Sequence, residues 1–194
     1  MNVVIVECDG GNVRSLKNAL NYVGIQNVIS ADPAVIQSAD CLIIPGQGHF
    51  GAVMHSLEKR GLTQVVRDFG QTKPLLGICV GMQILLDSSE EAPGVAGLGI
   101  FPGTVRRFPS SQKIPQMGWN CVQFTDPERA EHFYFANSYY CEVNDPTCIQ
   151  GTANYGFPFP TMIGKGSICG VQFHPEKSGE KGLLFLENFV RYSC

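Results

Sequence analysis

Short apolar runs alternate with amphipathic stretches through the first half of the chain. The first run, Val3–Val6, contains no polar position, which is typical of a strand buried on both faces. Asn12 can cap the helix predicted to follow. In that helix, apolar residues recur at helical spacing: Val13, Leu16, Leu20 and Val23.

The same alternation continues through three further strands and two further helices. Further strands are predicted at 26–30, Cys41–Ile44 and 74–78. One helix is predicted to begin at Asp32-Pro33, and another covers 63–69 and is closed by Gly70. This β-α-β-α order predicts an α/β fold with a doubly wound, mostly parallel sheet and helices on both faces.

The pattern changes to short strands and turns in the second half of the chain. Gly-Lys-Gly at 164–166 is the clearest hairpin signal, so we expect antiparallel strands to be added to the sheet here. Ser178 can cap a final helix. The apolar residues on one face of that helix are Leu183, Leu186, Phe189 and Val190.

Length and charge narrow the class of protein. A chain of 194 residues has the common size of one domain, so we expect a single domain over 1–194. The net charge is −3 and 16% of the residues are charged, which argues against a nucleic-acid partner. The chain shows no signal-peptide pattern and no apolar run of the roughly eighteen residues that span a membrane. We therefore expect a cytoplasmic protein without a membrane partner.

The eight cysteines allow two interpretations. An even number could form disulfides, but a reducing compartment and the lack of a Cys-x-x-Cys pair argue against both disulfides and a zinc site. We therefore expect most of them to be small buried apolar residues, and we expect no metal or cofactor. The neighbours of each cysteine decide whether one of them is chemically different.

One cysteine lies between two glycines where the strand at 74–78 meets a predicted helix. In the segment from Gly77 through Cys79 to Gly81, the glycines relieve crowding in a tight turn and leave the cysteine side chain exposed, as in a nucleophile elbow. The positive end of the next helix favours a thiolate, and the Val80 N–H points at a developing oxyanion. The alternative is an ordinary core cysteine near two of the chain's 22 glycines.

Of the four histidines, only His174 has a carboxylate placed to orient it. Pro175 favours an extended backbone, in which His174 and Glu176 point to the same side. Glu176 can then accept from one ring nitrogen while the other faces Cys79 and activates it. By itself, His-Pro-Glu is equally typical of a plain turn. The weaker candidates for the base are His49, His55 and His132.

A Pro-Gly-Gln-Gly turn at 45–48 follows the strand Cys41–Ile44. Its glycines, Gly46 and Gly48, allow the backbone to approach a substrate at the carboxyl edge of the sheet, where open α/β sheets bind ligands. Pro-Gly pairs are also the commonest sequence signal of ordinary turns, so the alternative is a turn without a function.

Together, the Pro-Gly-x-Gly loop, the Gly-x-Cys-x-Gly-x-Gln elbow and the His-Pro-Glu segment resemble, in this order, the class I glutamine amidotransferases. The resemblance implies a flavodoxin-like fold. Further segments extend it over nearly the whole chain and resemble the glutaminase subunits of imidazole glycerol phosphate synthases. These segments lie at 45–51, 115–120, 134–140 and 172–178.

The resemblance implies a mechanism and a partner. Cys79 would attack the side-chain amide of L-glutamine, His174 would move protons, and Glu176 would hold the imidazole. Backbone donors from Val80 and the Gly48 region would stabilise the oxyanion. The ammonia would pass to a (β/α)₈ cyclase subunit in a heterodimer of histidine biosynthesis. The residues around the bound glutamine would be Gly46, Gly48, Gln83, Ser138 and Tyr139.

Three residues match positions that face the partner in this family: Asn12, Trp119 and Lys177. Trp119 would suit the core equally well, and Lys177 could be a solvated charge. The chain departs from the family at 7–12, where Glu-Cys-Asp-Gly-Gly-Asn replaces the usual Asp-Tyr-Gly-x-Gly-Asn. It also departs at Asn137, where the family usually has histidine.

Three alternatives stay open at this point. The chain could serve a paralogous synthase with another ammonia acceptor. The same residues could belong to a different thiol hydrolase of flavodoxin-like fold, such as a peptidase-like enzyme or a stand-alone amidase. A subunit that docks but does not catalyse is the third possibility, and the presence of all three expected catalytic residues argues against it.

Overall fold

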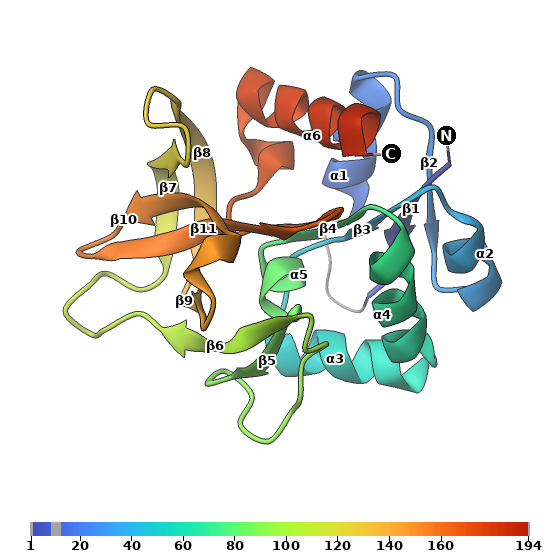
Figure 1. Ribbon diagram of the computed structural model, residues 1–194, viewed down its shortest axis with the longest axis horizontal. Helices are drawn as coiled ribbons and strands as arrows, with labels where there is room; N and C mark the ends of the chain where they lie inside the picture. The colour runs from blue at the N-terminus through green and yellow to red at the C-terminus, as the bar shows by residue number, and fades with distance from the viewer. Residues whose placement is uncertain (1, 9–12, 194) are drawn as a thin grey trace.

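A nine-stranded sheet runs through the molecule, with a three-stranded sheet beside it (Figure 1). The computed structural model describes residues 2–8 and 13–193. In spatial order, the strands of the large sheet are β2 (Asn27–Ser30), β1 (Val3–Val6), β3 (Cys41–Ile44), β4 (Leu75–Ile78), β12 (Ile168–Val171), β11 (Pro158–Lys165), β10 (Ile149–Asn154), β7 (Gln116–Phe124) and β8 (Ala130–Asn137).

The large sheet changes from parallel to antiparallel at β12. The strands from β2 to β12 pair in parallel, whereas those from β12 to β8 pair antiparallel. Every residue of β1, β3 and β4 is buried, as expected for parallel strands between two layers of helices. The predicted α/β fold with added antiparallel strands is therefore confirmed.

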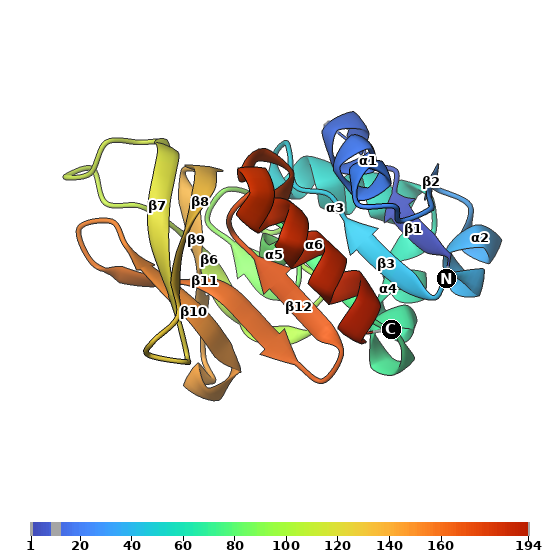
Figure 2. The ribbon, with the colours of Figure 1, turned by 90° about the horizontal axis from the view of Figure 1, so that it is seen from above.

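The helices cover both faces of the parallel part, as Figure 1 and the view from above in Figure 2 show. On one face lie α1 (Val13–Tyr22) and α6 (Gly179–Ser193). On the other face lie α2 (Pro33–Ser38), α3 (Phe50–Lys59), α4 (Leu62–Thr72) and the short α5 (Val80–Gln83). Two 3-10 turns complete the helical elements: η1 (Pro146–Cys148) and η2 (Pro175–Lys177).

The boundaries of two helices test the sequence predictions. Asp32 caps α2 as predicted, because its Oδ1 accepts from Ala34 N at 2.8 Å. The prediction that Gly70 closes α4 was wrong, because the helix continues to Thr72. Pro74 disfavours a helical backbone at the residue before it, Lys73, so the helix ends there. Helix α3 was not predicted, and the predicted cap of α1 at Asn12 lies outside the described residues.

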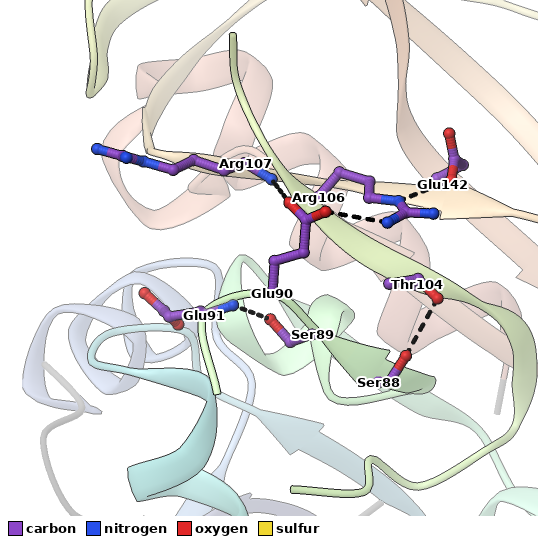
Figure 3. Close-up of polar contacts among 8 residues, drawn as sticks. All are labelled: Ser88, Ser89, Glu90, Glu91, Thr104, Arg106, Arg107 and Glu142. Carbon is purple, nitrogen blue, oxygen red and sulfur yellow. Dashed lines mark hydrogen bonds and ion pairs between the residues drawn. The ribbon is translucent and has the colours of Figure 1, made fainter. Parts of the chain in front are cut away.

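The small sheet consists of β5 (Leu86–Ser89), β6 (Phe101–Arg107) and β9 (Tyr139–Val143). Figure 3 shows the polar contacts that join its strands. Glu90 accepts from the backbone N–H of Arg107 at 2.8 Å and from the Arg106 guanidinium at 2.9 Å. Arg106 also donates to Glu142 on β9 at 2.9 Å. The turn after β5 is thus fixed to the strand that follows Ser138.

No cysteine among the described residues forms a disulfide. Cys121 is half-buried, and the other described cysteines outside the elbow are buried: Cys8, Cys41, Cys141, Cys148 and Cys169. Burial raises the pKa of Cys169 to about 12 and raises that of Cys141 as well, so these thiols stay protonated at neutral pH. Among the described residues, no helix is both long and apolar enough to cross a membrane.

Candidate active site

Cys79 lies between the last residue of β4 and the first residue of α5. Its backbone has φ 51° and ψ −107°, and among the described residues it is the one non-glycine residue with a positive φ. Such a conformation costs on the order of 1–3 kcal/mol. The Cys79 N–H donates to Val171 O at 2.7 Å, so the neighbouring strand β12 holds the strained turn. An ordinary core cysteine has no need of this strain.

The glycines on both sides of Cys79 are required because backbone segments approach closely. A Cβ atom on Gly77 would clash with the carbonyl oxygen of Gly81, and a Cβ atom on Gly81 would clash with the carbonyl oxygen of Ile44. The elbow therefore packs directly on the end of β3. Any side chain at these positions would push α5 away from the sheet and displace the cysteine.

His174 and Glu176 form a hydrogen-bonded pair beside the elbow. Strand β12 pairs in parallel with β4, with Val171 opposite Ile78, so the segment that follows Val171 runs past Cys79. His174 Nδ1 lies 2.8 Å from Glu176 Oε1, and the two side chains are 3% and 5% exposed. The predicted pairing is therefore confirmed, but the expected extended backbone was wrong at Glu176, which lies in the 3-10 turn η2.

Two opposing effects act on the imidazole of His174. Burial alone would lower its pKa because the charged form loses solvation. Hydrogen bonds to Cys79 and Glu176, together with their negative charges, outweigh burial and raise the pKa of His174 to about 10. Since Nδ1 bonds to Glu176, Nε2 is the nitrogen left for Cys79. The site therefore favours a positively charged imidazolium beside the nucleophile.

The backbone of His174 is held on both sides. Its N–H donates to Tyr134 O at 2.9 Å, and its carbonyl oxygen accepts from Ser178 Oγ at 2.6 Å. The same hydroxyl accepts from Tyr134 N at 2.9 Å. The prediction that the Ser178 side chain caps α6 is therefore corrected. Its hydroxyl already bonds to these two backbone groups, and it ties β8 to the segment that carries His174.

The segment 45–47 covers the catalytic groups. Cys79 is 4% exposed and His174 is 2% exposed, so the expected exposure of the thiol was wrong. A Cβ atom on Gly46 would clash with Ile78 O, which shows how closely this segment lies on the elbow. The hollow beside Glu176 holds about 10 Å³, whereas hollows of about 370 and 410 Å³ lie along α4, away from Cys79.

The structure brings together two of the residues expected around glutamine. Gln83 Nε2 donates to Tyr139 O at 3.2 Å, and Asn137 Nδ2 donates to the same oxygen at 2.9 Å. Asn137 is 4% exposed, so the residue that departs from the family pattern supports the backbone of Tyr139. Ser138 connects β8 to β9, and its carbonyl oxygen accepts from Phe108 N at 3.1 Å.

The two expected oxyanion positions differ in their surroundings. Val80 is buried as the first residue of α5, and its N–H donates to no other described residue. Gly48 is exposed and has φ 118°, a conformation that residues other than glycine rarely adopt. An unpaired backbone N–H beside a nucleophile is the type of donor that stabilises an oxyanion.

Sequence reasoning missed two polar residues near the site. Gln172 is wholly buried, and its Nε2 donates to Cys79 Sγ at 3.5 Å. The sequence around Gln172 gives no signal for this contact, because Glu176 lies in the 3-10 turn η2 and the two residues do not share one extended segment. Glu91 accepts from Phe50 N at 2.7 Å and so fixes the start of α3, directly after the covering segment. No local pattern around Glu91 indicates this contact.

The other histidines do not join the His174–Glu176 pair. His49 Nδ1 accepts from Gly51 N at 3.1 Å and caps α3. His55 lies within 2.6 Å of Gly51 O through Nδ1 and is exposed. His132 is exposed on β8. These contacts agree with the prediction that all three are weaker candidates for the base than His174.

Of the positions expected to face a partner, Trp119 and Lys177 are on the surface. Trp119 on β7 is 57% exposed, and the neighbouring Met117 is 68% exposed, so a core role for the tryptophan is wrong. The Trp119 ring lies against Tyr134, with ring centroids 6.3 Å apart. Lys177 is exposed in η2. Asn12 and most of the turn around it lie outside the described residues.

Comparison with known proteins gives a consistent family. The model of the family described as glutamine amidotransferase class-I matches residues 4–192. Imidazole glycerol phosphate synthase subunit HisH of Thermus thermophilus is 44% identical over 196 residues, covering 99% of this chain and 98% of that protein. Subunit HisH 1 of Methanococcus maripaludis is 41% identical over 199 residues, covering 97% and 98%.

Two solved structures show the same fold. A crystal structure of a glutamine amidotransferase has a TM-score of 0.80 at 20% identity and covers 98% of both chains. The structure of PurLQS from Thermotoga maritima has a TM-score of 0.69 at 17% identity, again over 98% of both chains. At these identities the likeness concerns the fold alone.

Proposed function

Because this chain belongs to the class-I glutamine amidotransferase family, we propose that it is the glutaminase subunit of an imidazole glycerol phosphate synthase. It hydrolyses the side-chain amide of L-glutamine and supplies the ammonia for histidine biosynthesis. The contact of the strained Cys79 with the buried His174–Glu176 pair carries the chemical part of the proposal.

In the first half-reaction, Cys79 Sγ attacks the amide carbon of glutamine. A C–S bond forms, and the carbonyl electron pair moves onto the oxygen, which the Val80 N–H stabilises. The imidazolium of His174 then gives its proton to the amide nitrogen, the C–N bond breaks, and ammonia leaves. A glutamyl thioester remains on Cys79. Glu176 keeps the imidazole in the orientation and tautomer that this step needs.

In the second half-reaction, water hydrolyses the thioester. Neutral His174 takes a proton from the water as its oxygen attacks the acyl carbon. The C–S bond breaks, glutamate forms, and the sulfur of Cys79 leaves as a thiolate beside the restored imidazolium. The raised pKa of His174 fits both steps, because the imidazole must hold a proton firmly until a nitrogen or sulfur anion forms next to it.

The ammonia acceptor lies on a second subunit. Relatives that cover nearly the whole chain are named as one subunit of a synthase. We assign the partner to the (β/α)₈ cyclase barrel that the sequence motifs imply, and we place Trp119 and Lys177 at its interface. The exposed Trp119 and Met117 support this, because exposed aromatic and methionine side chains are enriched at protein interfaces.

The proposal is tested by comparing glutamine with ammonium as the nitrogen source. With the cyclase partner and its nucleotide substrate present, Cys79→Ala should lower glutamine-dependent synthesis by at least about 10³-fold. Synthesis from ammonium salts should be unchanged, because only the nucleophile is missing. A variant that still uses glutamine would show that Cys79 is not the nucleophile. If the wild type used ammonium only when a different ammonia acceptor was supplied, the result would point to a paralogous synthase.

An electrophile experiment separates a glutaminase from another thiol hydrolase. A diazoketone analogue of glutamine should label Cys79 in the wild type, whereas a peptide chloromethyl ketone should not. Labelling by the peptide reagent alone would favour a peptidase-like enzyme. Failure of both reagents, with full ammonium-dependent synthesis in the complex, would favour a docking subunit without turnover.

A further inference from the structure

Gln172 lies against the nucleophile in the buried centre of the molecule. Val171, the last residue of β12, pairs with Ile78, the last residue of β4, so Gln172 and Cys79 directly follow the two paired strands. Its side chain is wholly buried, and Nε2 is 3.5 Å from Cys79 Sγ. No step of the mechanism above uses this residue.

The hydrogen-bond network fixes which end of the Gln172 amide faces the sulfur. A backbone carbonyl can only accept, so the Gln83 atom that contacts Tyr139 O at 3.2 Å must be its NH₂ group. The same NH₂ group lies 3.1 Å from the Gln172 side chain, where an acceptor is needed. That atom is therefore the carbonyl oxygen Oε1, and the NH₂ group of Gln172 points to Cys79.

We propose that Gln172 is a further catalytic residue, whose amide N–H stabilises negative charge on the sulfur of Cys79. A hydrogen bond to an ionised group is about twice as strong as one between neutral groups, and here no water can replace the donor because Gln172 is wholly buried. The inference rests on the proposed glutamine hydrolysis, but it does not depend on which synthase receives the ammonia.

The donor acts whenever the sulfur carries charge. Before the attack it favours the thiolate and holds Sγ in one direction. During thioester hydrolysis the C–S bond breaks and the electron pair returns to Sγ, which the same N–H then stabilises as a leaving group. The row of contacts from Tyr139 O through Gln83 to Gln172 also connects the nucleophile with the expected glutamine site, because Gln83 belongs to both.

The test measures the alkylation of Cys79 by iodoacetamide between pH 5 and pH 10, with mass spectrometry of the peptide that contains Cys79. Gln172→Met keeps the length of the side chain and removes both donors. We expect alkylation at neutral pH to slow by at least about tenfold and the midpoint of the pH profile to rise. With the partner present, kcat for glutamine should fall by a similar factor while KM changes little.

Thr161→Val is the matched control. Thr161 is wholly buried beside Gln172, whose N–H donates to Thr161 O at 2.8 Å, and its hydroxyl has no hydrogen-bond partner among the described residues. Removing this hydroxyl changes the local packing without touching the sulfur. The alkylation profile of this variant should match that of the wild type.

A second variant covers the case that Gln172→Met does not fold. Gln83→Met leaves Gln172 Oε1 without its donor, so the amide loses its fixed orientation and the alkylation profile should shift the same way by a smaller amount. Profiles of folded Gln172→Met and Gln83→Met within twofold of the wild type would overturn the inference. Failure of the glutamine diazoketone to label wild-type Cys79 would instead overturn the proposed function, so the two failures are distinguishable.

Discussion

The parallel strands around β4 and the antiparallel ribbon of β7 and β8 belong to one sheet, but they differ in what they bury. Every residue of β4 is buried, and the strand ends at a strained cysteine under a covering segment. On β7, buried and exposed residues alternate irregularly, and Trp119 and Met117 lie on the surface. The sheet thus combines a closed chemical site with an open aromatic face.

The difference follows from how each region is covered. Helices on both faces exclude water from the parallel part, and this strengthens the electrostatic contacts of His174 with Cys79 and Glu176. In the ribbon, α6 packs on β8 through Phe185 and Phe133, but Trp119 on β7 is 57% exposed, so its apolar surface is available for a second protein. The proposed catalytic and docking surfaces are therefore separate and meet at Tyr134, which contacts both His174 and Trp119.

The largest expected effect is in the closed site. His174→Asn should lower glutamate release in the presence of the partner by about 10³-fold or more, because the protons then have no carrier. Glu176→Gln should cost less, about 10²-fold, since the imidazole remains but its orientation is less well held. Ammonium-dependent synthesis is the control and should be unchanged in both. An equal loss of both activities would show that these residues stabilise the fold and do not take part in the reaction.

The next effect tests the backbone beneath that site. Gly81→Ala should lower the free energy of unfolding by about 3 kcal/mol, because the new Cβ would clash with Ile44 O. Gly166→Ala is the control, since it has φ 59° and no atom within 4 Å of the new Cβ. It should cost only the backbone strain, about 1 kcal/mol. Urea unfolding of both variants measures the difference, and equal losses would contradict the close approach.

A pH dependence of stability distinguishes the closed site from the open ribbon. His174 has a pKa of about 10 in the folded chain and 6.5 as its ordinary value. A group whose pKa is raised by folding stabilises the protein fully below its unfolded value and loses this contribution as the pH rises. The free energy of unfolding should therefore fall between pH 6.5 and about pH 10, by a few kcal/mol at most.

Two variants assign this slope to its source. Cys79→Ala removes one of the groups that raise the pKa of His174, so the slope between pH 6.5 and about pH 10 should become shallower. Trp119→Ala, on the ribbon, should keep the slope of the wild type. Urea unfolding at several pH values provides the measurement. An unchanged slope in Cys79→Ala would mean that another group titrates.

The smallest effect concerns the open face. Trp119→Ala should weaken the affinity for the cyclase subunit by about tenfold, because an aromatic residue in an interface contributes to the binding free energy. The alkylation of Cys79 should be unchanged. Tyr22→Ala is the control, because Tyr22 is 81% exposed on α1, away from the ribbon. Calorimetric titration of the two subunits measures both. Equal affinities for the two variants would remove Trp119 from the interface.

Much of the parallel half could be predicted from local patterns. Continuous apolar runs are typical of buried strands and predicted β1, β3 and β4. An Asp-Pro pair is typical of a helix start, and Asp32-Pro33 predicted the start of α2. Helix α3 was missed because its start depends on contacts outside the usual capping pattern. His49 accepts from Gly51 N, and the distant Glu91 accepts from Phe50 N.

The candidate site could be predicted in part. Cys79, His174 and Glu176 stood out because each occurs in a short motif with a chemical reason for its spacing. Gln172 did not, since a buried glutamine has no pattern until its neighbours are known. The exposure of Cys79 was also misjudged, because the segment that covers it comes from the end of another strand.

The sequence by itself determined which residue types are available and how each local segment folds. It placed a cysteine in a glycine elbow and a glutamate two residues after a histidine, and both patterns depend only on neighbours along the chain. Only the tertiary structure decided that these segments meet. The parallel pairing of β4 with β12 sets Val171 against Ile78 and so brings Gln172 and His174 to Cys79. Pairing between distant strands depends on the packing of the whole sheet, which no local pattern contains.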